Sequence, residues 1–168
     1  VPAYNEEETI ANTIKSIIEL NYPKDRLELV IVNDGSKDNT ESVVNQLIKE
    51  NPQINIILIN QKNAGKGAAL NKALNLAKGD FFVPLDADSY IRSDALKVIL
   101  PHFADKNVAA VLPLMKIKDP KNLLQKIQWA AYMGNLFYKR LMSLLDCVHV
   151  APGPFSVYRK KILLGVGG

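Results

Sequence analysis

The sequence predicts an α/β fold in which helices flank a mostly parallel β-sheet. Short β-branched runs alternate with longer segments of helical period, which is typical of βα units. The composition, 48% hydrophobic and 23% charged, is that of an ordinary soluble globular domain. A chain of 168 residues buries roughly 70% of the surface that its unfolded form exposes. We therefore expect one domain over residues 1–168.

The strands are expected where apolar, β-branched residues run together. The first is the end of a strand at residues 2–4. The chain begins at Val1 without an initiator methionine, so we expect it to be a piece of a longer protein, truncated at both ends. The other expected strands are 29–32, 54–59, 81–85, 108–112 and 148–151, the last running on toward 155–158.

The helices are expected where apolar residues recur at helical spacing. In the first, Ile10, Ile14 and Ile17 form one buried face. The expected helices are 7–20, 39–50, 66–77, 94–103 and 123–145. Ligands of such folds bind at the carboxyl ends of the strands, so the loops after strands are where chemistry is expected.

The most informative of these loops is Asp86-Ala87-Asp88, directly after the strand at 81–85. Two carboxylates at this spacing can converge on Mg²⁺, which typically takes one or two carboxylates and fills its other positions with phosphate oxygens and water. An EF-hand is excluded, because Ile91 and Lys97 occupy its required glycine and glutamate positions. Plain loop polarity remains an equal alternative for so short a pattern.

A second loop, Asn33-Asp34-Gly35-Ser36, follows the strand at 29–32. The Asp34 carboxylate can accept a hydrogen bond from a nucleobase imide, and Gly35 permits close approach. All four residues are also turn formers, so the segment taken alone favours a plain turn.

A third loop, Asn63-Ala64-Gly65-Lys66-Gly67, precedes a helix. Its glycines expose backbone N–H groups and Lys66 adds a positive charge, which suits phosphate. The glycines also come close to a dinucleotide fingerprint, although Leu70 stands where the third glycine belongs. A nicotinamide-dependent oxidoreductase is therefore the alternative enzyme.

The fourth motif, Pro2-Ala3-Tyr4-Asn5-Glu6, offers the flat ring of Tyr4 for a base and the acceptor Glu6. Glu7 and Glu8 are better explained as favourable charges at a helix N-terminus. All four motifs fall at one end of the predicted sheet. Together they predict a site for a metal-bound nucleoside diphosphate.

These motifs, in this order, resemble glycosyltransferase family 2, whose members have the GT-A fold. The segment Gly153-Pro154-Phe155-Ser156-Val157-Tyr158-Arg159-Lys160 is similar to the acceptor side of membrane-linked members such as hyaluronan, chitin and poly-N-acetylglucosamine synthases. The resemblance implies inverting transfer of a sugar from a nucleoside-diphosphate sugar, with a UDP-sugar expected, to a hydroxyl of a growing polysaccharide or lipid-linked glycan.

The resemblance also implies roles for individual residues. Asp34 would hold the uracil imide, Asp86 would face the ribose or donor sugar, and Asp88, with Asp86 as a second candidate ligand, would hold Mn²⁺ or Mg²⁺. Gly153 and Pro154 would border the acceptor. The full set of implied donor-binding residues is Pro2, Ala3, Tyr4, Glu6, Asp34, Asn63, Gly65, Lys66, Asp86, Ala87 and Asp88.

No general base is assigned within the chain. In the family the catalytic aspartate follows a Gly-Gly pair like Gly167-Gly168, where this chain stops, so the base is expected beyond it. We therefore expect donor binding with poor transfer, and a non-catalytic nucleotide-binding module remains a further alternative. His149 has a slight claim as an additional ligand.

Charge is divided along the chain. Residues 1–88 carry 9 Lys and Arg against 13 Asp and Glu, net −4, and residues 89–168 carry 12 against 4, net +8. The acidic first half argues against nucleic-acid binding. We expect residues 1–90 to form the nucleotide and metal half and residues 91–168 the acceptor half.

The segment 121–146 is basic, amphipathic and aromatic, which fits core packing and an anionic membrane surface about equally. The single cysteine, Cys147, favours a reducing compartment. With the resemblance, these features predict that the full-length protein acts at the cytoplasmic face of the cell membrane and that the fragment itself is soluble.

Overall fold

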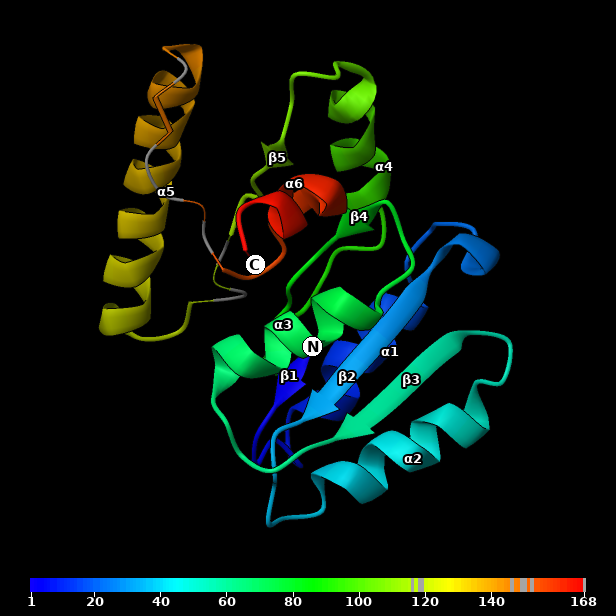
Figure 1. The fold of residues 1–168 in the computed structure, drawn as a ribbon. Helices are drawn as coiled ribbons and strands as arrows, with labels where there is room; N and C mark the ends of the chain where they lie inside the picture. The colour runs from blue at the N-terminus through cyan, green and yellow to red at the C-terminus, as the bar shows by residue number, and fades with distance from the viewer. Residues whose placement is uncertain (116, 118–119, 146, 149–150, 152, 168) are drawn as a thin grey trace. The chain divides into compact units, whose positions relative to one another are not determined.

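The computed structural model describes residues 1–115, 117, 120–145, 147–148, 151 and 153–167 (Figure 1). The chain divides into two compact units. The first comprises Val1–Val111 and Gly153–Gly168, and the second comprises Leu112–Pro152. The predicted donor residues all belong to the first unit.

A parallel sheet forms the centre of the first unit. Its strands are β1 (Pro2–Ala3), β2 (Glu28–Asn33) and β3 (Asn55–Asn60), in the order β1-β2-β3. Val32 of β2 is opposite Pro2, and Glu28 is opposite Asn55. The three strands therefore end at the same edge of the sheet, as the sequence predicted.

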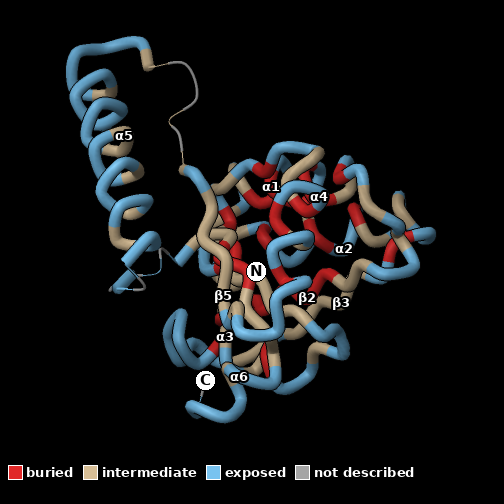
Figure 2. Tube along the Cα trace, turned by 90° about the horizontal axis from the view of Figure 1, so that it is seen from above, coloured by how far each residue is buried: buried red, intermediate tan, exposed pale blue. Residues whose placement is uncertain are grey.

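Helices α1 (Ile10–Ile18), α2 (Thr40–Glu50) and α3 (Lys66–Leu76) cover the two faces of this sheet (Figure 1). Leu29 and Ile31 of β2 pack in a cluster with residues of α1 and α2. Val30 and Val32 pack against α3. Because successive side chains of a strand point to opposite faces, the apolar run 29–32 is buried on both sides (Figure 2).

A second sheet, which the sequence did not predict, is antiparallel. Its strands are β4 (Phe81–Phe82), β6 (Val157–Arg159) and β5 (Ala110–Val111), in the order β4-β6-β5. The predicted strand at 81–85 ends at Phe82, since Pro84 has no N–H group to donate. The predicted strand at 108–112 is reduced to β5. Residues 149 and 150 of the predicted strand at 148–151 lie outside the described residues.

Arg159 of β6 joins this sheet to the segment before β5. Its guanidinium lies 5.2 Å from the ring centroid of Phe103 and donates to the carbonyl oxygens of Val108, Phe103 and Asp105. Phe103 also contacts Phe81, with 4.6 Å between the ring centroids. A sequence pattern does not reveal such long-range contacts.

Several helix boundaries differ from the prediction. The first helix begins at Ile10 instead of residue 7, and the carbonyl of Glu6 accepts from the amides of Thr9 and Ile10. The predicted helix at 94–103 is α4 (Ala95–Ile99) followed by the 3₁₀ helix η2 (Leu100–Ala104), which contains Pro101. Two short helices were not predicted: η1 (Lys24–Arg26) and α6 (Lys160–Gly165).

The second unit contains α5 (Leu123–Leu144), close to the predicted 123–145. The helix begins with a capping box, in which the amide of Gln125 donates to Oδ1 of Asn122 at 2.9 Å. None of its residues is buried (Figure 2). Within the described part of the chain, no helix has the length and apolar character needed to cross a membrane.

Candidate functional site

A pocket of about 280 Å³ lies where β1 and β2 end. It brings together nine of the eleven predicted donor-binding residues. The residues that line it are Pro2, Ala3, Tyr4, Glu6, Asp34, Lys66, Asp86, Ala87 and Asp88. Residues more than 80 positions apart thus meet in one cavity at the carboxyl edge of the parallel sheet.

The four other predicted residues do not line the pocket. Asn63 and Gly65 lie in the loop directly behind Asp34, and the amide of Gly65 donates to the Asp34 carboxylate. Gly153 and Pro154 precede Phe155, whose amide donates to the carbonyl of Pro84 at 2.7 Å. His149 lies outside the described residues.

Asp34 is the buried carboxylate of the pocket, with 4% of its surface exposed. Its Oδ1 accepts from Nε2 of Gln61 at 2.7 Å and from the amide of Ala64 at 2.9 Å, and its Oδ2 accepts from the amide of Gly65 at 2.9 Å. The Gln61 hydrogen bond is the main cause that lowers the pKa of Asp34; the two backbone bonds act in the same direction and burial opposes them. The group is therefore held as a carboxylate, with acceptor capacity left on Oδ2.

Two glycines with positive φ lie in the loops around Asp34. Gly35 has φ +77°, and a Cβ atom there would lie 2.9 Å from the backbone nitrogen of Asn63. Gly65, with φ +89°, immediately precedes α3. The sequence predicted a close approach at Gly35, and the structure shows that one such approach is to the chain's own Asn63 loop.

Opposite charges meet at the start of α3. Nζ of Lys66, the first residue of the helix, lies 2.5 Å from Oδ1 of Asp86. The two side chains are 57% and 30% exposed, so both reach solvent in the pocket. Lys66 and the free amides of the helix start suit an anion, while Asp86 and Asp88 suit a cation.

The pair Asp86 and Asp88 fits a divalent cation that is shared with a ligand. Among the residues that the structure describes, there is no group of three or more His, Cys, Asp or Glu side chains able to hold a metal. Two carboxylates in an open pocket correspond to the pattern of Mg²⁺, which is held by one or two carboxylates together with phosphate oxygens and water. The donor set thus fits a metal bound with a diphosphate and does not form an all-protein metal cage.

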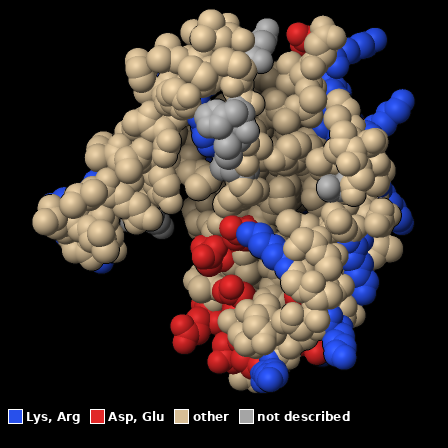
Figure 3. Space-filling model, turned by 60° about the vertical axis from the view of Figure 1, so that its left-hand side comes forward, with Lys and Arg blue, Asp and Glu red and all other residues tan. Residues whose placement is uncertain are grey.

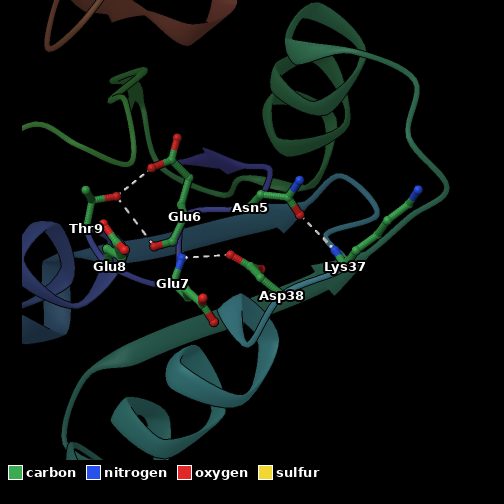
Figure 4. A pocket seen from close by; sticks show the side chains of 7 residues that line it. All are labelled: Asn5, Glu6, Glu7, Glu8, Thr9, Lys37 and Asp38. Carbon is green, nitrogen blue, oxygen red and sulfur yellow. Dashed lines mark hydrogen bonds between the residues drawn. The ribbon is translucent and has the colours of Figure 1, made fainter.

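A second hollow, of about 470 Å³, adjoins this pocket and shares Glu6 with it (Figure 4). It is lined by Asn5, Glu6, Glu7, Glu8, Thr9, Lys37 and Asp38. Its polar groups bond to one another: Oδ1 of Asn5 accepts from the amide of Lys37, and Oδ2 of Asp38 accepts from the amide of Glu7. Glu6, Glu7, Glu8 and Asp38 of this hollow add to the carboxylates of the pocket. Figure 3 shows Asp and Glu side chains gathered on one part of the surface.

Glu7 also has a role that differs from the sequence interpretation. Its Oε2 accepts from the backbone amide and the side-chain amide of Asn39, each at 2.9 Å. Asn39 precedes the first residue of α2. Glu7 therefore joins the α1 loop to the start of α2, whereas the first turn of α1 itself contains no acidic residue.

Three residues around the site were missed by the sequence analysis: Thr13, Ser16 and Gln61. Thr13 and Ser16 of α1 are each 1% exposed and bond to the loop that carries Asp86 and Asp88. Their position among the apolar residues of the first helix was the available signal in the sequence. It indicates that the two hydroxyls are buried, and a buried hydroxyl needs a hydrogen-bond partner. Gln61 had no comparable signal.

Comparisons with known proteins agree with this architecture. Residues 1–166 match the family described as glycosyl transferase family 2. The chain is 34% identical over 166 residues to a poly-beta-1,6-N-acetyl-D-glucosamine synthase of Staphylococcus aureus and 32% identical to that of Staphylococcus epidermidis. In both cases the match covers 98% of this chain and 39% of the relative, so the chain spans about two fifths of those proteins.

Two solved structures show the same fold. The mannosyltransferase PcManGT of Pyrobaculum calidifontis, in complex with GDP-Man and Mn²⁺, has a TM-score of 0.80 and 29% identity, covering 99% of this chain and 45% of that one. Residues 1–349 of S. aureus TarS, in complex with UDP, have a TM-score of 0.73 and 25% identity, covering 98% and 47%. This chain therefore belongs to glycosyltransferase family 2 and has the GT-A fold.

Proposed function

We propose that this chain forms the donor-binding part of an inverting glycosyltransferase that moves a sugar from a UDP-sugar to a hydroxyl group of a glycan or lipid-linked acceptor. The observation that carries the proposal is the pocket itself. It combines the buried acceptor Asp34, the cation Lys66 and the carboxylate pair Asp86 and Asp88 within about 280 Å³. Residues 1–90 form the nucleotide and metal half, and residues 91–168 form the acceptor half.

In this proposal each part of the donor meets a matching group of the chain. Asp34 accepts the N–H of the base, and the ring of Tyr4, which is 45% exposed, borders it. Lys66 and the start of α3 face the diphosphate. Asp88, together with Asp86, holds Mg²⁺ or Mn²⁺, which when bound would stabilise the negative charge on the leaving diphosphate.

Uracil is the base that suits Asp34 best. Oδ1 already accepts two hydrogen bonds, from Gln61 and from the amide of Ala64, so the remaining capacity is on Oδ2. The Watson–Crick edge of uracil presents one N–H donor, the imide, whereas that of guanine presents two. The UDP complex of TarS also supports this choice, although the GDP-Man complex of the mannosyltransferase shows that the fold accepts guanine nucleotides elsewhere.

The acceptor in this proposal is a growing polysaccharide or a lipid-linked glycan, next to Gly153 and Pro154. The names of the staphylococcal relatives, poly-beta-1,6-N-acetyl-D-glucosamine synthases, support a glycan. Exposed apolar side chains on α5, such as Leu123 and Trp129, occur beside the basic Lys126. This combination supports action at the cytoplasmic face of a membrane.

We assign no general base to the chain and propose that the carboxylate that deprotonates the acceptor hydroxyl is supplied from outside residues 1–168. A non-catalytic nucleotide-binding module is the second candidate, since it would need the same pocket and no base. Release of UDP from a UDP-sugar by a longer chain would exclude the second candidate. The family match leaves the nicotinamide-dependent alternative without support.

Calorimetry with UDP tests the proposal. UDP should bind in the presence of Mn²⁺ and bind far more weakly in EDTA, and Asp88→Asn should remove the gain from Mn²⁺. Asp25→Asn, which removes an exposed carboxylate of η1, is the matched control and should bind as the wild type does. Equal UDP binding with Mn²⁺ and with EDTA, or no binding, would contradict the proposal.

A further inference from the structure

The buried face of α1 contains two hydroxyl groups among apolar side chains. Thr13 and Ser16 are each 1% exposed, and their neighbours on the helix, Ile10, Ile14 and Ile17, belong to the apolar core. A hydroxyl buried without a partner is costly, so the partners of these two residues indicate what they do.

Both hydroxyls bond to the loop after β4. Oγ1 of Thr13 donates to the carbonyl oxygen of Ala87 at 2.7 Å. Oγ of Ser16 accepts from the backbone amide of Ile91 at 3.2 Å and itself donates to the carbonyl of Thr13 at 2.7 Å. The loop is therefore bonded to one helix face at two points, four residues apart, that enclose Asp88.

Other backbone hydrogen bonds of this loop are made by the amide of Phe155 to the carbonyl of Pro84 at 2.7 Å and by the amide of Ser89 to the carbonyl of Asp86 at 3.1 Å; neither holds the carbonyl of Ala87. Strand β4 ends at Phe82, so the ladder with β6 stops four residues before Asp86. Ala87, whose carbonyl Thr13 binds, stands between the two carboxylates and is itself 4% exposed. Because the carbonyl of Ala87 and the amide of Asp88 belong to one peptide plane, holding that carbonyl also fixes the backbone from which the Asp88 side chain projects.

We propose that Thr13 and Ser16 are positioning residues for the carboxylate pair, and that their hydroxyls set the metal-dependent part of nucleotide binding. This inference rests on the proposed function. The inference extends the proposed function, because it assigns the orientation of the metal site to two residues of a helix outside the pocket. Groups that orient metal ligands from behind typically change metal affinity on the order of tenfold or more when removed.

The decisive variant is Thr13→Val, which keeps the shape of the side chain and removes the donor. We expect the affinity for UDP with Mn²⁺ to fall on the order of tenfold. The affinity for uridine, which lacks phosphate and uses only the Asp34 side of the pocket, should stay the same when followed by NMR. Thr13→Ser, which restores the hydroxyl, should recover UDP binding.

A variant in a different apolar cluster provides the control. Val157→Ala, in β6, removes buried apolar volume from the cluster of Ile99, Phe103 and Val157, which contains none of residues 85–91. It should lower the unfolding temperature and leave the ratio of the UDP–Mn²⁺ affinity to the uridine affinity unchanged. Should Thr13→Val not fold, Ser16→Ala decides in its place, with a loss in the same direction.

The outcomes separate the two proposals. If wild-type chain gains no UDP affinity from Mn²⁺, the proposed function fails. If Mn²⁺ raises the UDP affinity of the wild type and raises that of Thr13→Val by the same factor, the positioning role is overturned. An equal loss of uridine and UDP–Mn²⁺ affinity in Thr13→Val would also overturn it, because that result indicates general damage to the pocket.

Discussion

Lys66 Nζ lies 2.5 Å from Asp86 Oδ1 and links the start of α3 to the first carboxylate of the Asp86-Ala87-Asp88 motif. Ion pairs between partly exposed side chains contribute at most about 1 kcal/mol to stability. The pair is therefore easily exchanged, and Lys66 is free to contact an anion that enters beside Asp86.

The first prediction concerns this lysine. Lys66→Met should weaken the binding of UDP with Mn²⁺ on the order of tenfold, because a charge-assisted hydrogen bond to phosphate is lost. Lys49→Met, which removes an exposed lysine from the last turn of α2, is the control and should bind UDP normally. Calorimetry with both variants measures the effect; equal affinities would show that Lys66 does not contact the diphosphate.

The second prediction concerns Asp34. In Asp34→Asn, the amide group cannot accept from Gln61, Ala64 and Gly65 together, so at least one of these part-buried hydrogen bonds to a charged acceptor is lost. We expect a loss of about 1–3 kcal/mol in the free energy of unfolding. Binding of uridine should also be lost, since the base no longer meets a carboxylate. Urea unfolding and uridine titration followed by NMR measure the two effects, and an unchanged uridine affinity would contradict the assignment of the base site.

The third prediction is the pH dependence of that stability. The folded pKa of Asp34 is lowered, so its contribution is present above the unfolded pKa of about 4 and is lost as pH falls through the folded value. The difference in unfolding free energy between the wild type and Asp34→Asn should therefore shrink in acid. Asp38, whose pKa is also lowered, is present in both proteins and cancels in this comparison. A difference that stays constant down to pH of about 2 would refute the prediction.

The fourth prediction compares two glycines. Gly35→Ala places a Cβ 2.9 Å from the Asn63 nitrogen at φ +77°, so it should destabilise the fold by roughly 1–3 kcal/mol and disturb the loop that supplies hydrogen bonds to Asp34. Gly67→Ala meets no atom within 4 Å and lies within α3, where alanine is favoured over glycine by up to about 1 kcal/mol. The thermal unfolding temperature should thus fall in Gly35→Ala and rise in Gly67→Ala. A shift in the same direction in both variants would contradict the account of the Gly35 turn.

The position of the site could be predicted from the sequence because it depends on where strands end. The run 29–32 is apolar on both faces, so its end places Asp34 at the edge of the sheet. The same reasoning is only partly right for Asp86, because β4 ends at Phe82 and belongs to the antiparallel sheet. Gln61, Thr13 and Ser16 could not be assigned in this way. Gln61 is 27 residues from Asp34, and Thr13 is 74 from Ala87, so their contacts exist only once the chain has folded.

The second sheet was predicted only in part. β4, β5 and β6 overlap the strands predicted at 81–85, 108–112 and 155–158, but they are only two or three residues long, and their antiparallel pairing was not predicted. The pairing of Phe81 with Arg159 joins distant parts of the chain. Short strands of this kind are defined by their partners, whereas β2, with six residues, carries its own signal.

The central claim is that Asp34 and Asp88 hold the two ends of one nucleoside diphosphate. The most direct measurement is a crystal structure of the chain with UDP and Mn²⁺, with the manganese located by anomalous scattering. We predict a manganese peak within coordination distance of the Asp88 carboxylate and of the diphosphate, with the uracil imide bonded to Asp34. A nucleotide bound elsewhere, or a manganese ion away from Asp88, would contradict the claim.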